Sequence, residues 1–145
     1  MYVESILAVK GAEVATIGPE ASVGEAVATL REHRVGALVV SSDGSHIAGI
    51  VSERDIVRRL ADHAEGTLAL AVGDVMTREV TTCGAKDTIE KLMWLMTEQR
   101  IRHVPVVDDD GVLVGIVSIG DVVKHRLGQL ESENKALYEY ITQGR

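Results

Sequence analysis

The stretch Gly49-Ile50-Val51-Ser52-Glu53-Arg54-Asp55-Ile56-Val57 returns 66 residues later as Gly115-Ile116-Val117-Ser118-Ile119-Gly120-Asp121-Val122-Val123. The same offset aligns Thr16 with Thr82 and Arg34 with Arg100. Identities held at one constant spacing indicate an internal repeat. We therefore divide the chain into two copies, residues 1–66 and 67–127, followed by a tail, residues 128–145.

Each copy shows the same order of strand-like and helix-like segments. The pattern predicts a strand, a helix, two strands joined by a turn, and a final helix. The predicted strands are residues 14–17, 37–40 and 47–51 in the first copy and 80–83, 104–107 and 112–117 in the second. Because three strands cannot bury both faces of a sheet alone, the copies should share a core. The predicted fold class is α/β (α+β): two β-α-β-β-α repeats related by a pseudo-twofold axis and packed as one module, plus a C-terminal helix.

Composition excludes several classes of protein. The 145 residues are 46% hydrophobic but only 3% aromatic, so small aliphatic side chains must fill the core. A formal charge of −7 disfavours binding to nucleic acid or to an anionic membrane. Cys83 is the only cysteine, which excludes an internal disulfide and a cysteine-built zinc site. The sequence shows neither a signal peptide nor a membrane span, so we expect a cytoplasmic protein.

The sequence also lacks the patterns that accompany metal binding and catalysis. Its five histidines have no zinc-ligand spacing. There is no nucleophile elbow and no Gly-rich Walker loop. We therefore expect no bound metal, no required cofactor and no enzymatic activity.

A Ser-x-x-Asp motif stands in each copy where a strand gives way to a helix, at Ser52 and Asp55 and at Ser118 and Asp121. One interpretation is a capping box, in which the two residues bond the first turn of the helix. The other is a ligand site. A carboxylate can accept two hydrogen bonds from the vicinal hydroxyls of a ribose, and a serine hydroxyl beside helix N–H groups suits a phosphate. One residue pair can fill both roles.

With these motifs the chain resembles a tandem cystathionine-β-synthase (CBS) domain pair over about residues 5–127. The resemblance rests on the paired Gly-Ile-Val-Ser-x-x-Asp blocks and on two further phrases. These phrases are Arg102-His103-Val104-Pro105-Val106-Val107-Asp108 and Asp74-Val75-Met76-Thr77. The first copy departs from the pattern in two places: its opening phrase aligns as Ala8-Val9-Lys10-Gly11, and Val39 replaces the strand proline.

The resemblance implies a stand-alone regulatory protein that binds an adenosine compound such as AMP, ADP, ATP, NAD(H) or S-adenosylmethionine in clefts between the repeats. Basic residues favour a ligand with a phosphate. It also implies the site residues. The first cleft is expected to hold Thr16, Ser52, Arg54 and Asp55, with Gly36 and Ala37 leaving room for a base at the equivalent of Arg102-His103. The second is expected to hold Thr82, Arg102, His103, Ser118 and Asp121.

Each of these residues also has an ordinary structural interpretation. Thr16 and Thr82 suit strands for their β propensity alone. Arg102 could be a solvated charge at a strand edge, and His103 a satisfied polar group at a strand start.

Two helical surfaces predict a homodimer. The helix around Trp94 is apolar on nearly all sides, so part of it should meet another subunit. In the tail, Leu127, Leu130, Asn134, Leu137 and Ile141 follow the spacing of a coiled-coil seam. The alternative for the tail is a helix folded back onto its own module. The alternative for the whole protein is a structural or interaction dimer with vestigial ligand pockets.

Overall fold

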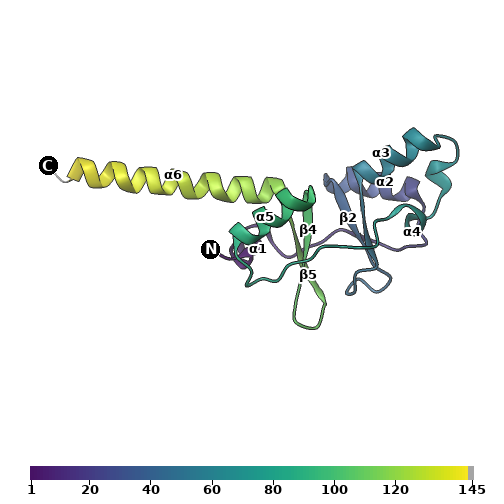
Figure 1. The fold of residues 1–145 in the computed structure, drawn as a ribbon, viewed down its shortest axis with the longest axis horizontal. Helices are drawn as coiled ribbons and strands as arrows, with labels where there is room; N and C mark the ends of the chain where they lie inside the picture. The colour runs from purple at the N-terminus through teal and green to yellow at the C-terminus, as the bar shows by residue number, and fades with distance from the viewer. Residues whose placement is uncertain (144–145) are drawn as a thin grey trace.

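The computed structural model describes residues 1–143. It contains two α/β halves that lie side by side, with one long helix projecting from the second half (Figure 1). The chain begins with α1 (Val3–Lys10), β1 (Thr16–Ile17), α2 (Val23–His33), β2 (Ala37–Val40), β3 (Gly49–Ser52) and α3 (Glu53–Asp62). After a short 3₁₀ helix (Thr67–Ala69), it continues with α4 (Val72–Val75), α5 (Ile89–Gln99), β4 (His103–Val107), β5 (Leu113–Ser118) and α6 (Ile119–Gln143). The predicted α/β class and the C-terminal helix are confirmed.

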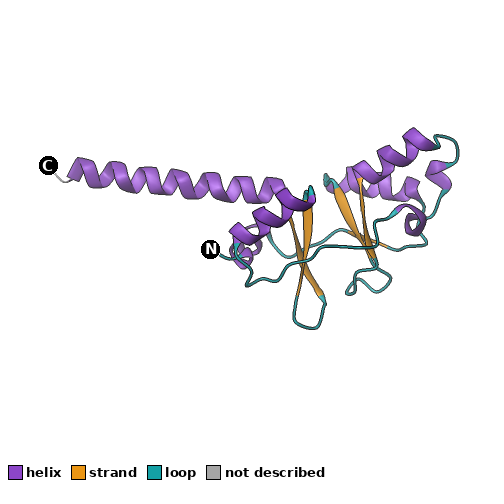
Figure 2. Ribbon diagram, viewed as in Figure 1, coloured by secondary structure: helices purple, strands orange, loops and turns teal. Residues whose placement is uncertain are grey.

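Each half places its helices against a small sheet (Figure 2). In the first half the strand order is β1-β2-β3, with β1 parallel and β3 antiparallel to β2. In the second half β4 and β5 pair antiparallel. The predicted strand at residues 80–83 is reduced to a single parallel bridge between Cys83 and Val106.

A proline explains the shorter sheet of the second half. Val39 donates its N–H to the carbonyl of Ala15 at 3.3 Å and so extends the pairing of β1 with β2. Pro105 takes the place of Val39 in the second repeat. Because proline has no N–H, this bond cannot form there. Two bonds remain in the second repeat. Cys83 donates its N–H to the carbonyl of Pro105 at 3.0 Å, and Val107 donates its N–H to the carbonyl of Cys83 at 2.9 Å.

Two short helices, α1 and α4, were not predicted from the sequence. Each of them packs in the core of the other repeat. Val3 and Ile6 of α1 are buried in the core of the second repeat, beside Ile89 and Leu92. Val72 of α4 is buried in the core of the first repeat. Each repeat therefore contributes its opening segment to the other core, and the two connecting segments cross between the halves (Figure 1).

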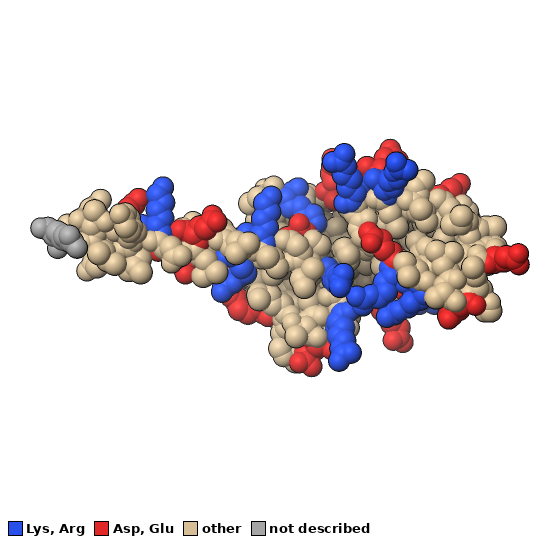
Figure 3. Space-filling view, turned by 90° about the horizontal axis from the view of Figure 1, so that it is seen from above, with Lys and Arg blue, Asp and Glu red and all other residues tan. Residues whose placement is uncertain are grey.

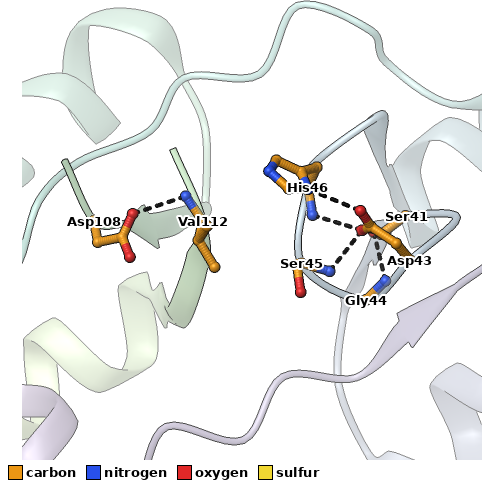
Figure 4. A network of polar contacts seen from close by, with 7 residues as sticks. All are labelled: Ser41, Asp43, Gly44, Ser45, His46, Asp108 and Val112. Carbon is orange, nitrogen blue, oxygen red and sulfur yellow. Dashed lines mark hydrogen bonds and ion pairs between the residues drawn. The ribbon is translucent and has the colours of Figure 1, made fainter. Parts of the chain in front are cut away.

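The two predicted turns form, and aspartate carboxylates hold them (Figure 4). Asp43 Oδ1 accepts the N–H groups of Ser45 and His46, each at 2.8 Å, and Asp43 Oδ2 lies 2.8 Å from His46 Nδ1. These hydrogen bonds, led by the one from the His46 N–H, hold the pKa of Asp43 well below its ordinary value. In the second turn Asp108 Oδ1 accepts the N–H of Val112 at 2.9 Å.

The long helix α6 extends well past the module (Figure 1). Its first turns pack on α1, α5 and β5. From residue 126 to residue 143 every side chain is exposed except Gln129, which is partly buried. The tail therefore does not fold back onto its own module, which was one of its two interpretations.

Candidate functional site

Both Ser-x-x-Asp motifs form helix caps. At the start of α3, Ser52 N donates to Asp55 Oδ2 at 2.9 Å and Asp55 N donates to Ser52 Oγ at 3.2 Å. At the start of α6, the corresponding distances from Ser118 and Asp121 are 2.8 and 3.2 Å. The capping interpretation is thus confirmed in both repeats. In each cap the main-chain N–H reaches Oδ2, which leaves Oδ1 for other partners.

A residue of the second repeat faces the carboxylate of the first. Thr77, just after α4, pairs with Ile50 of β3 through two backbone hydrogen bonds of 2.8 and 3.0 Å. From this position Thr77 Oγ1 donates to Asp55 Oδ1 at 3.3 Å. The hydroxyl of Thr77 and the carboxylate of Asp55 therefore meet between the two repeats.

A residue of the first repeat faces the carboxylate of the second. Lys10, the last residue of α1, places Nζ 2.6 Å from Asp121 Oδ2 and 2.7 Å from the carbonyl oxygen of Ile116. Burial alone would raise the pKa of Asp121. Hydrogen bonds from Lys10 and Ser118 outweigh burial, so the pKa lies below its ordinary value. No hydrogen-bond donor among residues 1–143 reaches Asp121 Oδ1.

The backbone corrects the alignment of the opening phrases. Val3 N donates to the carbonyl of Asp87, and Val72 N donates to the equivalent carbonyl of Ala21. Val3 thus matches Val72, so the phrase 74–77 corresponds to residues 5–8 rather than 8–11. Ala8 occupies the place of Thr77, and residues 9–11 are an insertion. This insertion carries Lys10, which explains why the repeats differ beside their carboxylates.

The repeats also meet at Gly36 and His103. A Cβ added to Gly36 would lie 3.2 Å from Cε1 of His103 and 3.5 Å from Oε1 of Glu53. The imidazole of His103 therefore packs close to Gly36, and the role of Gly36 beside a base stays a prediction. Burial is the main cause that lowers the pKa of His103, and the nearby Lys10 cation lowers it further.

The remaining predicted residues donate no side-chain hydrogen bond to either carboxylate within residues 1–143. Thr16 is on β1, and β2 separates this strand from β3, where Ser52 ends the sheet. Thr82 is exposed and precedes the single bridge at Cys83. Arg54 is exposed in the first turn of α3, and Arg102 is exposed directly before β4. Ala37 begins β2 and is buried against the core, opposite Ser52 in register.

Three residues at this junction escaped the sequence analysis: Lys10, Glu53 and Thr77. Thr77 belongs to a phrase that the resemblance had already marked. A carboxylate faced by a segment from the other repeat requires the exchange of α1 and α4, which the constant offset alone does not reveal. Lys10 lies in the insertion, where no offset could locate it.

A groove of about 780 Å³ adjoins the Lys10–Asp121 pair, between α1 and the first half of α6. This volume is within the usual range for small-molecule sites. Asp121 and Lys10 line it with apolar side chains that include Ile6 and Val9. His125 also lines it, and its buried Nε2 has no hydrogen-bond partner within the described part of the chain.

Seen from above, Lys and Arg side chains gather over the junction of the halves, although the chain is acidic overall (Figure 3). Residues 1–143 contain no group of three His, Cys, Asp or Glu side chains placed to hold a metal ion. Within the same residues no helix is both long and apolar enough to cross a membrane.

Comparison with known proteins places this architecture in a family. The family model of the CBS domain matches residues 7–62 and 72–128. The CBS domain-containing protein CBSX3, mitochondrial, of Arabidopsis thaliana is 39% identical over 127 residues, which cover 85% of this chain and 61% of that protein.

Two solved structures share the fold. The crystal structure of the CBS-domain-containing protein ATU1752 from Agrobacterium tumefaciens has a TM-score of 0.83 at 45% identity, covering 87% of this chain and 99% of that one. The CBS domain pair of protein MJ0100, in complex with 5-methylthioadenosine and S-adenosyl-L-methionine, has a TM-score of 0.78 at 27% identity. It covers 89% of this chain and 98% of that one. The protein with these two matched repeats belongs to the CBS domain family.

Proposed function

We propose that this protein is a regulatory, non-catalytic sensor that binds an adenine nucleotide, either AMP, ADP, ATP or NAD(H), in clefts between its two repeats. The observation that carries the proposal is the pair of carboxylates, Asp55 and Asp121, each facing a segment from the other repeat. Support comes from the relative MJ0100, whose structure contains two adenosine compounds. Each carboxylate would accept the vicinal hydroxyls of the ribose.

Regulation would follow from the position of the clefts. A ligand that contacts Asp121 and the segment after α1 touches both repeats at once. It would bind tightly only when those repeats hold one relative orientation, and would therefore shift the module towards that orientation. A partner protein could then recognise the shifted surface.

Calorimetry with two carboxylate variants tests this proposal. We expect Asp55→Asn to remove binding at one cleft and Asp121→Asn at the other, with affinity falling about ten- to hundredfold. The amide keeps an oxygen acceptor for the helix cap. Asp62→Asn, at the exposed end of α3, is the matched control. Unchanged affinity and stoichiometry in both cleft variants would refute the ribose assignment.

The second candidate function is a structural or interaction dimer with vestigial pockets. Exposed apolar side chains favour a dimer: Trp94 on α5 is 62% exposed and Val57 on α3 is also 62% exposed. A melting-temperature screen separates the candidates, because a tight ligand raises the melting temperature by mass action. No shift with millimolar AMP, ATP, NAD(H) or S-adenosylmethionine would favour this second function. Turnover of any of these compounds would refute the non-catalytic assignment.

A further inference from the structure

The two equivalent carboxylates have chemically different partners. Asp55 receives a neutral hydroxyl from Thr77 at 3.3 Å, whereas Asp121 receives the ammonium group of Lys10 at 2.6 Å. The structural counterpart of Thr77 in the first repeat is Ala8, whose side chain has no polar group. The insertion at residues 9–11 supplies the lysine instead.

The Lys10–Asp121 ion pair is partly shielded from water. The two side chains are 29% and 24% exposed, and the Lys10 ammonium also bonds the carbonyl of Ile116. Screening by solvent is therefore weaker than for a pair on the open surface. A ligand that competes for Asp121 must replace this charge-assisted bond or offer Lys10 another anion.

Each cleft is assigned one arginine, so these arginines alone do not distinguish the two clefts. Arg102 lies directly before β4, and the imidazole of His103, whose pKa is lowered mainly by burial, adds no fixed positive charge. Arg54, exposed on α3, is the one cation assigned to the first cleft. Glu53 also faces His103, so its negative charge offsets part of the cationic character of the junction.

From this geometry we infer that Lys10 makes the Asp121 cleft selective for adenosine ligands that carry a phosphate. The Asp55 cleft, which lacks this ammonium, accepts adenosine compounds without that requirement. This inference rests on the proposed function and specifies the class of ligand for each cleft. Asp121 Oδ1 accepts no hydrogen bond from residues 1–143 and can therefore accept one from a ribose hydroxyl. The phosphate of the ligand then provides a second anion for Lys10.

Titration with adenosine and AMP in the full chain tests the role of Lys10. Asp55→Asn silences the first cleft, so the measured affinities report the second. We expect the preference for AMP over adenosine to fall about tenfold or more when Lys10→Met is added, mainly through weaker AMP binding. Lys10→Arg retains the charge and should retain the preference. Lys86→Met is the control, because it removes the 3.0 Å pair with Glu4 on the same helix α1 and leaves Asp121 untouched.

The outcomes distinguish a failure of this inference from a failure of the proposed function. An unchanged AMP preference in the Lys10→Met protein, with AMP still bound, overturns the inference and leaves nucleotide binding intact. Loss of the preference in Lys86→Met as well overturns it too, since the effect would then come from a loosened α1. If neither AMP nor adenosine binds the unmodified protein at either cleft, the proposed function and the inference fail together.

Discussion

At the residue scale, two side chains at the repeat junction combine a helix-capping role with the ligand-binding role proposed above. Asp55 and Asp121 cap helices through Oδ2, while Oδ1 accepts from Thr77 in Asp55 and from no donor of residues 1–143 in Asp121. A carboxylate fixed by its own helix cap has a defined orientation before any ligand arrives. Such preorganisation lowers the entropic cost of binding.

Two equivalent glycines should respond differently to the same substitution. A Cβ on Gly49 would lie 2.7 Å from the carbonyl oxygen of Thr77, whereas a Cβ on Gly115 would lie 2.7 Å from Cδ2 of Leu7. Backbone cannot move as freely as the tip of a leucine. We expect Gly49→Ala to lower the free energy of unfolding by about 1–3 kcal/mol and Gly115→Ala by less.

Urea denaturation of the two glycine variants measures this difference. Gly49→Ala should also weaken nucleotide binding at Asp55, because it displaces the segment that holds Thr77. Equal stability of the two proteins would contradict the close backbone approach.

His103 should make folding sensitive to mild acid. Burial and the Lys10 cation lower its pKa from the ordinary value of 6.5. Between the lowered pKa and 6.5, the unfolded chain binds more protons at this position than the folded chain. The contribution of His103 is therefore lost as the pH falls below about 6.5.

Replacing the imidazole isolates this effect. We expect His103→Gln to lose less stability than the unmodified protein between pH 7.5 and pH 5.5, measured by urea denaturation at each pH. The four other histidines remain in both proteins and cancel in the comparison. Parallel pH profiles would show that His103 is as easily protonated in the folded state as in the unfolded chain.

At the scale of elements, one proline accounts for the difference between the sheets. We expect Val39→Pro to lower the free energy of unfolding by about 1–3 kcal/mol, because the carbonyl of Ala15 then loses its donor. Pro105→Val is the reciprocal variant: it restores an N–H at this position and should raise the free energy of unfolding by about 0.5–1.5 kcal/mol. Urea denaturation compares them. A Val39→Pro protein as stable as the original would show that the β1–β2 bond contributes nothing.

The constant offset and the residue periodicity were sufficient to predict the two repeats, the helix that follows the first predicted strand in each, and the turn between the next two strands. Local sequence could not reveal α1 and α4 in their exchanged positions, since residues 3–10 and 72–75 are short and gain their burial from the other repeat. Because of the same exchange, the contacts of Thr77 and Lys10 with the carboxylates could not be predicted, although the carboxylates themselves were. The ligand-binding roles predicted for all eleven site residues remain predictions.

At the scale of the whole molecule, exposed apolar side chains lie on α5 and along the projecting helix α6. Met93 and Trp94 of α5 are exposed, as are Ile119 and Val123 at the start of α6. Further along α6 the exposed residues Leu127, Leu130, Leu137 and Ile141 follow on the same side. A single chain leaves this whole stripe in water, which is typical of a surface that meets a second copy.

Charges beside the stripe favour two parallel helices. With Leu127 and Asn134 at a positions, Arg126 is at g and Glu131 at the following e. In a parallel pair these positions face each other across the seam and carry opposite charges. Asn134 at an a position would specify a two-stranded register at some cost in stability.

Truncation after Gly128 tests the seam directly. We expect the shortened protein to form a weaker dimer, measured by light scattering at micromolar concentration, while nucleotide affinity at Asp55 stays the same because Asp55 and Thr77 lie outside α6. The remaining contact would be the face around Trp94, so dimerisation should weaken rather than vanish. Leu137→Ser should reproduce part of the loss, whereas Glu139→Ser, on the opposite side of α6, should not. An unchanged dimer dissociation constant after truncation would mean that the stripe serves another partner, and the dimer would then rest on α5 alone.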